Sequence, residues 1–366
     1  MPGVFQRKRI KPGSRIRVLV VDDSVVIRRL VTHALSEDPA FEVVGSAANG
    51  AIALARIPQL NPDVVTLDIQ MPEMDGLQAL REIRKQYPDL CVIMFSTLTE
   101  RGATATIEAL MLGANDYVTK AANVGSLDVS MATLRSELIP KIKQFFILPG
   151  AETQLAPAAA TAVPAAPAAR SPVTVHARPR VVAIGVSTGG PNALSVVMPM
   201  FPADFPLPIL IVQHMPPLFT RFLAERLTAL SRIRVEEATE AATVEPGKAL
   251  IAPGDYHMRL ARRDGKVVVR LDQGPPENSC RPSVDVLFRS VEEIYGGAVI
   301  SVILTGMGQD GLRGAEVLKA AGAWVIAQDE ATSVVWGMPG AVVQAGLADR
   351  VVSLENVAPE ITRLAG

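Results

Sequence analysis

The stretch VVAIGVSTGGPNAL, residues 181–194, contains the junction that decides how the second half of the chain folds. Its first six residues are apolar and rich in β-branched side chains, which is typical of a buried parallel strand. The residues from Gly189 onward open like a helix, with Pro191 suited to a first helical turn. Ser187 is therefore expected on a tight turn between a strand and a helix, facing whatever lies beyond the sheet.

The same junction matches the pattern Gly-x-Ser-x-Gly over residues 185–189. Small residues in this pattern let a nucleophilic serine stand on a strained strand-to-helix turn, but a short motif is only a hypothesis until its context is found. Two alternatives need no nucleophile. One is a glycine turn for close packing of helix on strand, and the other is a phosphate-binding turn at a helix N-terminus.

Two further side chains with useful chemistry follow apolar strands in this half. His214 comes directly after PILIVQ (208–213), and Asp310 lies in a glycine-rich loop after AVISVILTGMG (298–308). Because the carboxyl ends of parallel strands share one edge, we expect Ser187, His214 and Asp310 to meet as nucleophile, base and orienting carboxylate. The alternatives are a hydrogen-bonded core histidine and an aspartate that only braces its turn.

Two other residues compete for these roles. His257, in IAPGDYHMRL (251–260), is a rival base, but its stretch has the pattern of a β-hairpin arm. Cys280, in NSCRPSVDVLF (278–288), is a weaker candidate nucleophile because no histidine lies near it in the sequence. The order serine, histidine, aspartate also excludes a plain α/β-hydrolase, in which the acid precedes the histidine.

The first half alternates five strand-like runs with helical patterns, which predicts a doubly wound parallel sheet. Polar residues end the first, third, fourth and fifth runs: Asp22, Asp23, Asp68, Ser96 and Lys120. Three carboxylates at one edge repel one another unless a cation joins them, and oxygen ligands suit Mg²⁺. The alternative is that each acid caps the helix that follows it. That alternative does not explain a lysine and a hydroxyl at the same edge.

Residues 155–172 are rich in alanine and proline and poor in bulky apolar side chains, which is typical of an extended, semi-rigid linker. The chain of 366 residues is long enough for two cores. We therefore predict two doubly wound parallel α/β domains, flavodoxin-like and then Rossmann-like. The predicted ranges are 16–134 for the first domain, 135–172 for the linker and 173–366 for the second domain.

Composition excludes several classes of function. The formal net charge is −1, so no global positive field favours nucleic acid as a partner, although the N-terminus is locally basic. The two cysteines lie far apart without metal-ligand spacing, which fits a reducing compartment. No run approaches the ~20 apolar residues that a membrane span requires. We expect a cytoplasmic protein that neither binds nucleic acid nor inserts into membranes.

The first half resembles a response-regulator receiver domain. The motifs that carry the resemblance are VVDDS (20–24), LDIQMPEMDG (67–76) and DYVTK (116–120). The resemblance implies that Asp68 accepts a phosphoryl group from a histidine kinase. It implies that Asp22 and Asp23, with Asp68, hold Mg²⁺, and that Ser96 and Lys120 contact the phosphoryl group. Receivers usually have proline after this lysine, whereas this chain has Ala121, which bears on how the switch is passed to the second domain.

The second half resembles the catalytic domain of the CheB family of chemotaxis methylesterases. The resemblance is carried by IGVSTGG, IVQHMP, IAPGDYHMRL, RPSVDVLF, ILTGMGQDG and GMPGAV. It implies hydrolysis of glutamyl methyl esters on chemoreceptor helices, with release of methanol and often deamidation of receptor glutamines. Ser187 would be the nucleophile, and the Met307 backbone amide would stabilise the oxyanion. No cofactor is expected in this half.

Three alternatives come from other classes of function. A dedicated protein-glutamine deamidase would use the same three residues on an amide. A phosphorylation-dependent binding module would need no catalytic residues, and the intact set of Ser187, His214 and Asp310 argues against it. A DNA-binding regulator needs a basic recognition element, which the second half lacks.

Overall fold

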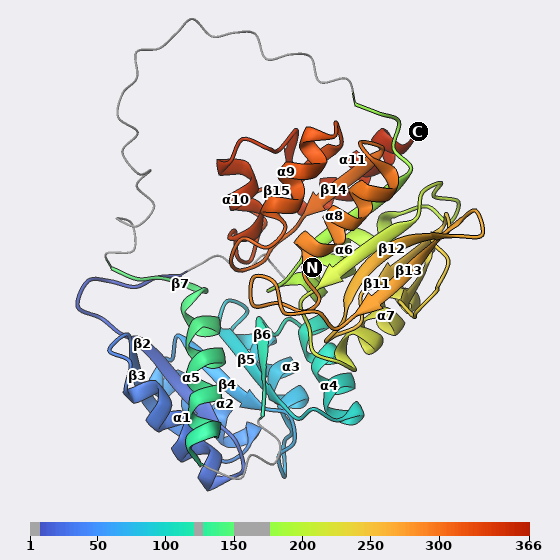
Figure 1. The fold of residues 1–366 in the computed structure, drawn as a ribbon. Helices are drawn as coiled ribbons and strands as arrows, with labels where there is room; N and C mark the ends of the chain where they lie inside the picture. Colours follow the sequence, from blue (N-terminus) through green and yellow to red (C-terminus); the bar gives the residue numbers. More distant parts are fainter. Residues whose placement is uncertain (1–7, 121–126, 150–175) are drawn as a thin grey trace, which may run out of the picture.

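The computed structural model describes residues 8–120, 127–149 and 176–366, which form two α/β units (Figure 1). We label residues 8–120 and 127–149 the receiver unit, and residues 176–366 the esterase unit, after the families that their sequences resemble. The predicted linker at 155–172 and Ala121 lie outside the described residues. Within these ranges no helix is long and apolar enough to cross a membrane.

The receiver unit contains a five-stranded parallel sheet in the order β3-β2-β4-β5-β6. Its strands are β2 (Ile16–Val21), β3 (Phe41–Ala47), β4 (Val64–Asp68), β5 (Cys91–Ser96) and β6 (Asp116–Thr119). Its helices are α1 (Val25–Ser36), α2 (Gly50–Leu60), α3 (Gly76–Gln86), α4 (Glu100–Met111) and α5 (Leu127–Lys143). Side chains on both faces of the central strands are buried because helices cover both faces of the sheet.

Ordered structure in this unit continues beyond the predicted boundary at residue 134. Helix α5 runs to Lys143, and β7 (Phe146–Ile147) pairs in parallel with β1 (Lys8–Arg9). Leu138, Ile142, Phe145 and Phe146 are buried in the receiver core. The physical reason is that these apolar side chains complete the core, so residues 135–148 belong to the receiver unit and not to a linker.

The esterase unit contains a seven-stranded parallel sheet in the order β10-β11-β9-β8-β14-β15-β16. Its strands are β8 (Val181–Val186), β9 (Ile209–Gln213), β10 (Arg234–Glu237), β11 (Lys248–Ile251), β14 (Val299–Ile303), β15 (Trp324–Gln328) and β16 (Arg350–Val352). The α-helices are α6 (Gly190–Val197), α7 (Phe219–Leu230), α8 (Val284–Tyr295), α9 (Leu312–Ala320), α10 (Met338–Gln344) and α11 (Leu354–Ala365), and a 3₁₀ turn, η2, covers Met198–Met200.

The prediction of two doubly wound parallel units is confirmed by the two sheets. In the esterase unit the chain starts at the central strand β8, moves outward through β9, and returns to β14 on the other side of β8. The strand order therefore reverses beside β8, and ligands of open α/β sheets bind at such a reversal, beyond the carboxyl ends of the strands.

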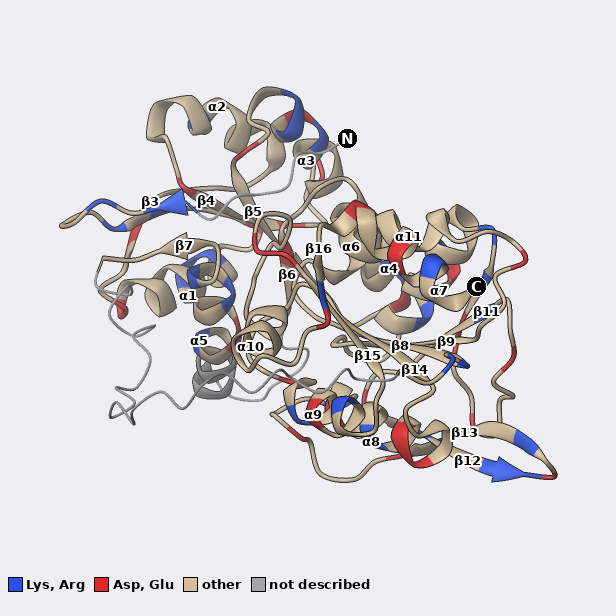
Figure 2. Ribbon diagram, turned by 90° about the horizontal axis from the view of Figure 1, so that it is seen from above, with Lys and Arg blue, Asp and Glu red and all other residues tan. Residues whose placement is uncertain are grey.

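An antiparallel hairpin, β12 (His257–Arg263) and β13 (Lys266–Asp272), lies outside the main sheet. This confirms the prediction that His257 belongs to a hairpin arm. Figure 2 shows Lys and Arg positions, coloured blue, on the ribbon of this hairpin at the outer edge of the esterase unit. The hairpin packs against α8, with the Leu260 amide donating to Ser290 Oγ at 2.7 Å.

Candidate active site and receiver cluster

Ser187 lies on the tight turn that the sequence predicts. Strand β8 ends at Val186, and α6 begins at Gly190 with Pro191 in its first turn. The Ser187 amide donates to Thr305 O at 3.0 Å, which ties the turn to the loop after β14. Gly189 has φ +77°, and a Cβ on Gly190 would lie 1.9 Å from Gln213 Oε1, so both positions require glycine.

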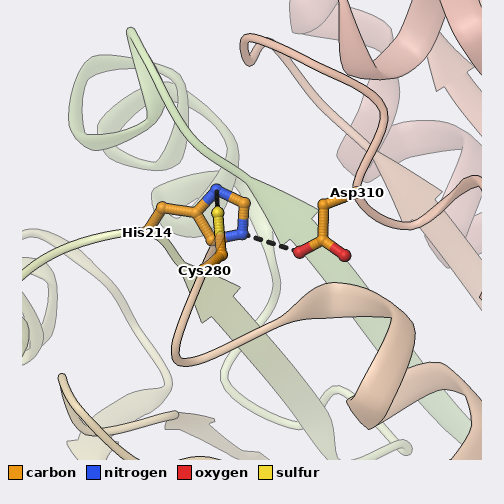
Figure 3. Close-up of side chains that lie close together, drawn as sticks. All are labelled: His214, Cys280 and Asp310. Atoms are coloured by element: carbon orange, nitrogen blue, oxygen red, sulfur yellow. Dashed lines mark hydrogen bonds and ion pairs between the residues drawn. The ribbon is translucent and has the colours of Figure 1, made fainter. Parts of the chain in front are cut away.

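His214 follows β9, the neighbour of β8, and its amide donates to Val186 O at 3.2 Å. Its imidazole lies between two partners, as Figure 3 shows: Nε2 is 2.8 Å from Asp310 Oδ2, and Nδ1 is 3.6 Å from Cys280 Sγ. Because the ionised carboxylate only accepts hydrogen bonds, Nε2 carries the proton that points toward it. Nδ1 is then the nitrogen available to act as a base.

Asp310 is buried, with 2% of its surface exposed, in the loop between β14 and α9. Besides His214, its oxygens accept hydrogen bonds from the Asn278 and Ser283 side chains and from the amides of Val284, Asp285 and Gly311. These donors fix the carboxylate in one orientation. The loop therefore positions an ionised acid against the imidazole, as a base-orienting carboxylate requires.

Burial and hydrogen bonding act in opposite directions on this pair. Burial raises the pKa of Asp310, but the bond and charge of His214, with the bonds from Val284 and Ser283, outweigh burial and lower that pKa to about 2. Burial lowers the pKa of His214, but the hydrogen bonds and charges of Asp310 and Cys280 outweigh it and raise that pKa to about 9. The contact between the two side chains therefore favours the charged form of each.

Ser187 and His214 line one cavity of about 430 Å³, together with Met307. None of the hydrogen bonds among the described residues joins the Ser187 hydroxyl to His214, whose Nδ1 is in contact with Cys280 Sγ. Within the same ranges the Met307 amide donates no hydrogen bond to another backbone group. The cavity thus brings together a hydroxyl, an imidazole and a backbone donor with no backbone partner.

The two competing residues differ in placement. His257 is 1% exposed and bonds only backbone groups, with Nε2 3.0 Å from Pro275 O and Nδ1 accepting from the Ser283 amide at 3.3 Å. Cys280 instead lies beside His214. Sequence reasoning missed this contact, because the loop that carries Cys280 reaches His214 only through the tertiary fold.

The receiver unit covers the same cavity. Its Leu110, Asp116, Tyr117 and Lys141 line the cavity opposite Ser187. A neighbouring cavity of about 370 Å³ is also lined by both units, with Glu137 on one side and Arg281 on the other. In this arrangement both units therefore contribute side chains to the cavity that Ser187 lines.

Helices from the two units form the contact that holds the receiver in this place. Figure 1 shows α4 beside α7, and α4 also packs against α6. The rings of Tyr117 and Phe219 stack, and Arg221 of α7 pairs with Glu100 of α4 at 2.6 Å. The interface thus combines a buried aromatic stack with an exposed ion pair.

The acid cluster also forms in the receiver unit. Carboxylate oxygens of Asp22, Asp23 and Asp68 lie within 4.8 Å of one another. Lys120 Nζ lies 2.8 Å from Asp22 Oδ2 and 2.8 Å from Asp68 Oδ1. Burial raises the pKa of Asp68, and Lys120 opposes that shift only in part. Burial lowers the pKa of Lys120, but its bonds to Asp22 and Asp68 outweigh burial and raise it.

Ser96 lies at the end of β5, but its hydroxyl is turned toward α4. It donates to Gly102 O at 3.2 Å and accepts from Thr106 Oγ1 at 2.6 Å. Of the five predicted receiver residues, four form one cluster, and the Ser96 hydroxyl bonds outside it. Its predicted contact with a phosphoryl group requires a rotation about its side-chain bond.

Each of the two units matches a known protein family. Residues 182–361 match the family described as CheB methylesterase, and residues 18–131 match the response regulator receiver domain. Over 354 residues the chain is 51% identical to a protein-glutamate methylesterase/protein-glutamine glutaminase of Trichodesmium erythraeum, covering 96% of this chain and 99% of that protein. The chain belongs to the CheB methylesterase family. It is a hydrolase of that family with an N-terminal receiver domain.

Other CheB-type proteins support the assignment. A Nocardioides protein of the same description is 52% identical over 357 residues, covering 96% of this chain and 95% of that protein. The solved Thermotoga maritima CheB methylesterase catalytic domain is 45% identical, with a TM-score of 0.50, covering 51% of this chain and 98% of that domain. The CheB resemblance in the sequence is thus confirmed over nearly the whole chain.

Proposed function

We propose that the esterase unit hydrolyses glutamyl methyl esters on the cytoplasmic helices of chemoreceptors, releasing methanol, and also deamidates receptor glutamines. The observation that carries this proposal is the hydrogen bond between His214 Nε2 and Asp310 Oδ2, at the sheet edge where Ser187 stands. The names of the relatives, methylesterase and glutaminase, support the substrate class. The reaction would take place in the cytoplasm.

The mechanism follows from this geometry. His214 Nδ1 takes the proton of the Ser187 hydroxyl as the oxygen attacks the ester carbonyl carbon. The tetrahedral intermediate collapses, the bond to methoxide breaks, and the imidazolium returns the proton, so methanol leaves and an acyl-enzyme remains. Water then attacks the acyl carbon with His214 again as base, releasing glutamate. With a glutamine substrate the same steps release ammonia.

The oxyanion of each tetrahedral intermediate requires preorganised donors. The Met307 amide is our candidate because it faces the same cavity and has no backbone partner within the described residues. The N-terminus of α6 at Gly190 adds a modest favourable dipole. Cys280 must give up its place at Nδ1 before Ser187 can transfer its proton.

Control would come from the receiver unit, with Asp68 as the phosphoacceptor and a histidine kinase as donor. The residues fit Mg²⁺, because Asp22, Asp23 and Asp68 supply only oxygen ligands within 4.8 Å of one another and the single positive charge of Lys120 does not balance three carboxylates. When bound, Mg²⁺ would neutralise negative charge on the transferred phosphoryl group. Lys120 adds a second positive charge, and Ser96 would turn from α4 toward the phosphoryl oxygens.

Inhibition in the resting state would follow from the receiver side chains that line the cavity beside Ser187. Every tenfold of inhibition requires ~1.4 kcal/mol of preference for the covered arrangement, which phosphorylation must offset. Because the chain connects the two units at high effective concentration, a weak contact is enough.

The experiment that tests this function measures methanol and ammonia released from methylated receptor, with and without a small phosphodonor and Mg²⁺. We expect the phosphodonor to raise the rate of the full-length protein. Fragment 173–366 should release methanol faster than the unphosphorylated full-length protein does, and the phosphodonor should not change the rate of the fragment. Release of ammonia without methanol would identify a dedicated deamidase. Equal resting rates for fragment and full-length protein would refute inhibition by covering.

A further inference from the structure

The contact between Cys280 and His214 has no place in ester hydrolysis. Sγ lies 3.6 Å from Nδ1, and the thiol lines both cavities beside His214 (Figure 3). The sequence has one other cysteine, Cys91, which is completely buried in the receiver core. A half-buried thiol in contact with an imidazole supplies two kinds of ligand atom that Zn²⁺ uses. Whether one ion can bind both depends on the distance between the sulfur and the nitrogen.

The separation of the two atoms fits a tetrahedral zinc ion. With Zn–S near 2.3 Å and Zn–N near 2.0 Å, a tetrahedral angle places sulfur and nitrogen about 3.5 Å apart. The observed distance is 3.6 Å. The separation therefore suits one ion, and a turn of the Cys280 side chain that brings Sγ from the ring face, where Figure 3 shows it, toward the ring plane would aim both donors at that ion.

Asp310 supports the same arrangement from the other side of the ring. A histidine that binds a metal usually donates its second N–H to a carboxylate, which fixes the tautomer. His214 Nε2 makes this contact with Asp310 Oδ2 at 2.8 Å. The Nδ1 lone pair, in the plane of the ring, is then left for a second partner.

Asp310 itself is not a ligand in this arrangement, although its carboxylate lies within 4.8 Å of the other two donor atoms. Its oxygens already accept bonds from the side chains and amides that surround it. The protein thus supplies two ligands, and the cavity of about 430 Å³ has room for water at the remaining positions. Two protein ligands suit an exchangeable ion and not a structural one.

We propose that Cys280 and His214 form an inhibitory site for a thiophilic divalent cation such as Zn²⁺, distinct from the oxygen cluster at Asp68. On binding, the thiol proton and the proton on His214 Nδ1 go to solvent, and no group is oxidised or reduced. The ion occupies the Nδ1 lone pair that would accept the proton of Ser187, so binding excludes catalysis. This consequence rests on the proposed esterase function, whereas the site itself does not.

The test uses full-length protein with excess Mg²⁺ to fill the oxygen cluster and Co²⁺ as the probe. We expect a thiolate-to-cobalt charge-transfer band that saturates at one equivalent and that Zn²⁺ removes. Cys280→Ser should abolish the band. The same change should raise the Zn²⁺ concentration for half-inhibition of methanol release at least tenfold, each protein being compared with its own metal-free rate.

Ser279→Ala is the matched control, because it alters the adjacent residue and keeps the thiol. It should retain both the band and the sensitivity to Zn²⁺. Absence of a thiolate band in the unmodified protein, or equal sensitivity of Cys280→Ser to Zn²⁺, would overturn the site. A normal band in a protein that releases no methanol when metal-free would leave the site standing and refute the esterase function.

Discussion

The ring of Tyr117 in the receiver unit lies stacked on the ring of Phe219 in the esterase unit, with centroids 5.0 Å apart and planes 9° from parallel. Tyr117 belongs to β6, which ends one residue before Lys120, and Phe219 is the first residue of α7. The stack therefore connects the strand that leads to the phosphorylation cluster with a helix of the catalytic unit.

Removing this stack should raise the resting rate of ester hydrolysis. An aromatic pair contributes ~0.5–1.5 kcal/mol beyond its burial, so Tyr117→Ala should increase methanol release by about 2- to 10-fold. Tyr117→Phe keeps the ring and is the control. A resting rate for Tyr117→Ala equal to that of Tyr117→Phe would show that the stack does not hold the receiver in place.

Reversing the charges of the ion pair between Arg221 and Glu100 tests the same contact between the two units. Both side chains are well exposed, so the pair contributes only ~0.2–1 kcal/mol. Glu100→Lys should raise the resting rate by a few-fold at low salt, because two cations then face each other. Combining it with Arg221→Glu restores the opposite charges and should restore inhibition, as measured by methanol release across a salt series. A double variant as active as the single one would contradict a direct pairing.

Ser187→Ala should leave only the residual ~10³- to 10⁴-fold acceleration that binding and an oxyanion hole can supply. Ser195→Ala, in the same helix region but with its hydroxyl bonded to Asn192 O, is the control and should retain activity. Near-normal methanol release by Ser187→Ala would show that Ser187 is not the nucleophile, and Cys280 would then be the next candidate for that role.

Alanine variants of His214 and His257 should separate an effect on catalysis from an effect on stability. His214→Ala should resemble Ser187→Ala in rate, because it removes the base. His257→Ala should instead lower the free energy of unfolding by about 1–3 kcal/mol, since it leaves the Ser283 amide and Pro275 carbonyl unpaired, while the folded fraction stays active. Denaturant titration and methanol release measured on both variants check this, and a reversed pattern would show that the base was misassigned.

Asp68→Asn should lose Mg²⁺-dependent binding of beryllofluoride and activation by a phosphodonor, because the acceptor carboxylate is gone. Asp75→Asn is a matched control: Asp75 caps α3 nearby, and asparagine caps equally well. Calorimetric titration with beryllofluoride measures the difference. Equal affinity in Asp68→Asn and the unmodified protein would refute Asp68 as the site.

Most of the fold could be predicted because periodicity and strand ends are local signals. The five receiver strands and the strands β8, β9 and β14 of the second unit are rich in apolar and β-branched residues, and a polar residue at the end of such a strand in a parallel sheet reaches a shared edge. Ser187, His214 and Asp310 follow from that rule, since each lies after one of these strands. The acid cluster follows from the same rule.

The rest depends on tertiary contacts that leave no periodic trace. Cys280 reaches His214 through a loop whose path is set by bonds such as that from Asn278 to Asp310. The Ser96 hydroxyl faces α4 because of the rotamer that its side chain adopts, and the sequence pattern does not determine that rotamer. The C-terminal boundary of the receiver unit was predicted too early, because Phe145 and Phe146 pack into the core after the helical pattern stops.

The contact between the units has a consequence for exchanging domains between proteins. The acid cluster around Asp68 lies at the strand ends, whereas Glu100 and Tyr117, which contact the esterase unit, belong to α4 and β6. A foreign receiver grafted onto this esterase would keep its own phosphorylation chemistry and yet leave the enzyme permanently on. A working chimera would have to carry α4 and β6 as a matched set with α7, so the transferable unit of control is this three-element surface and not the receiver domain as a whole.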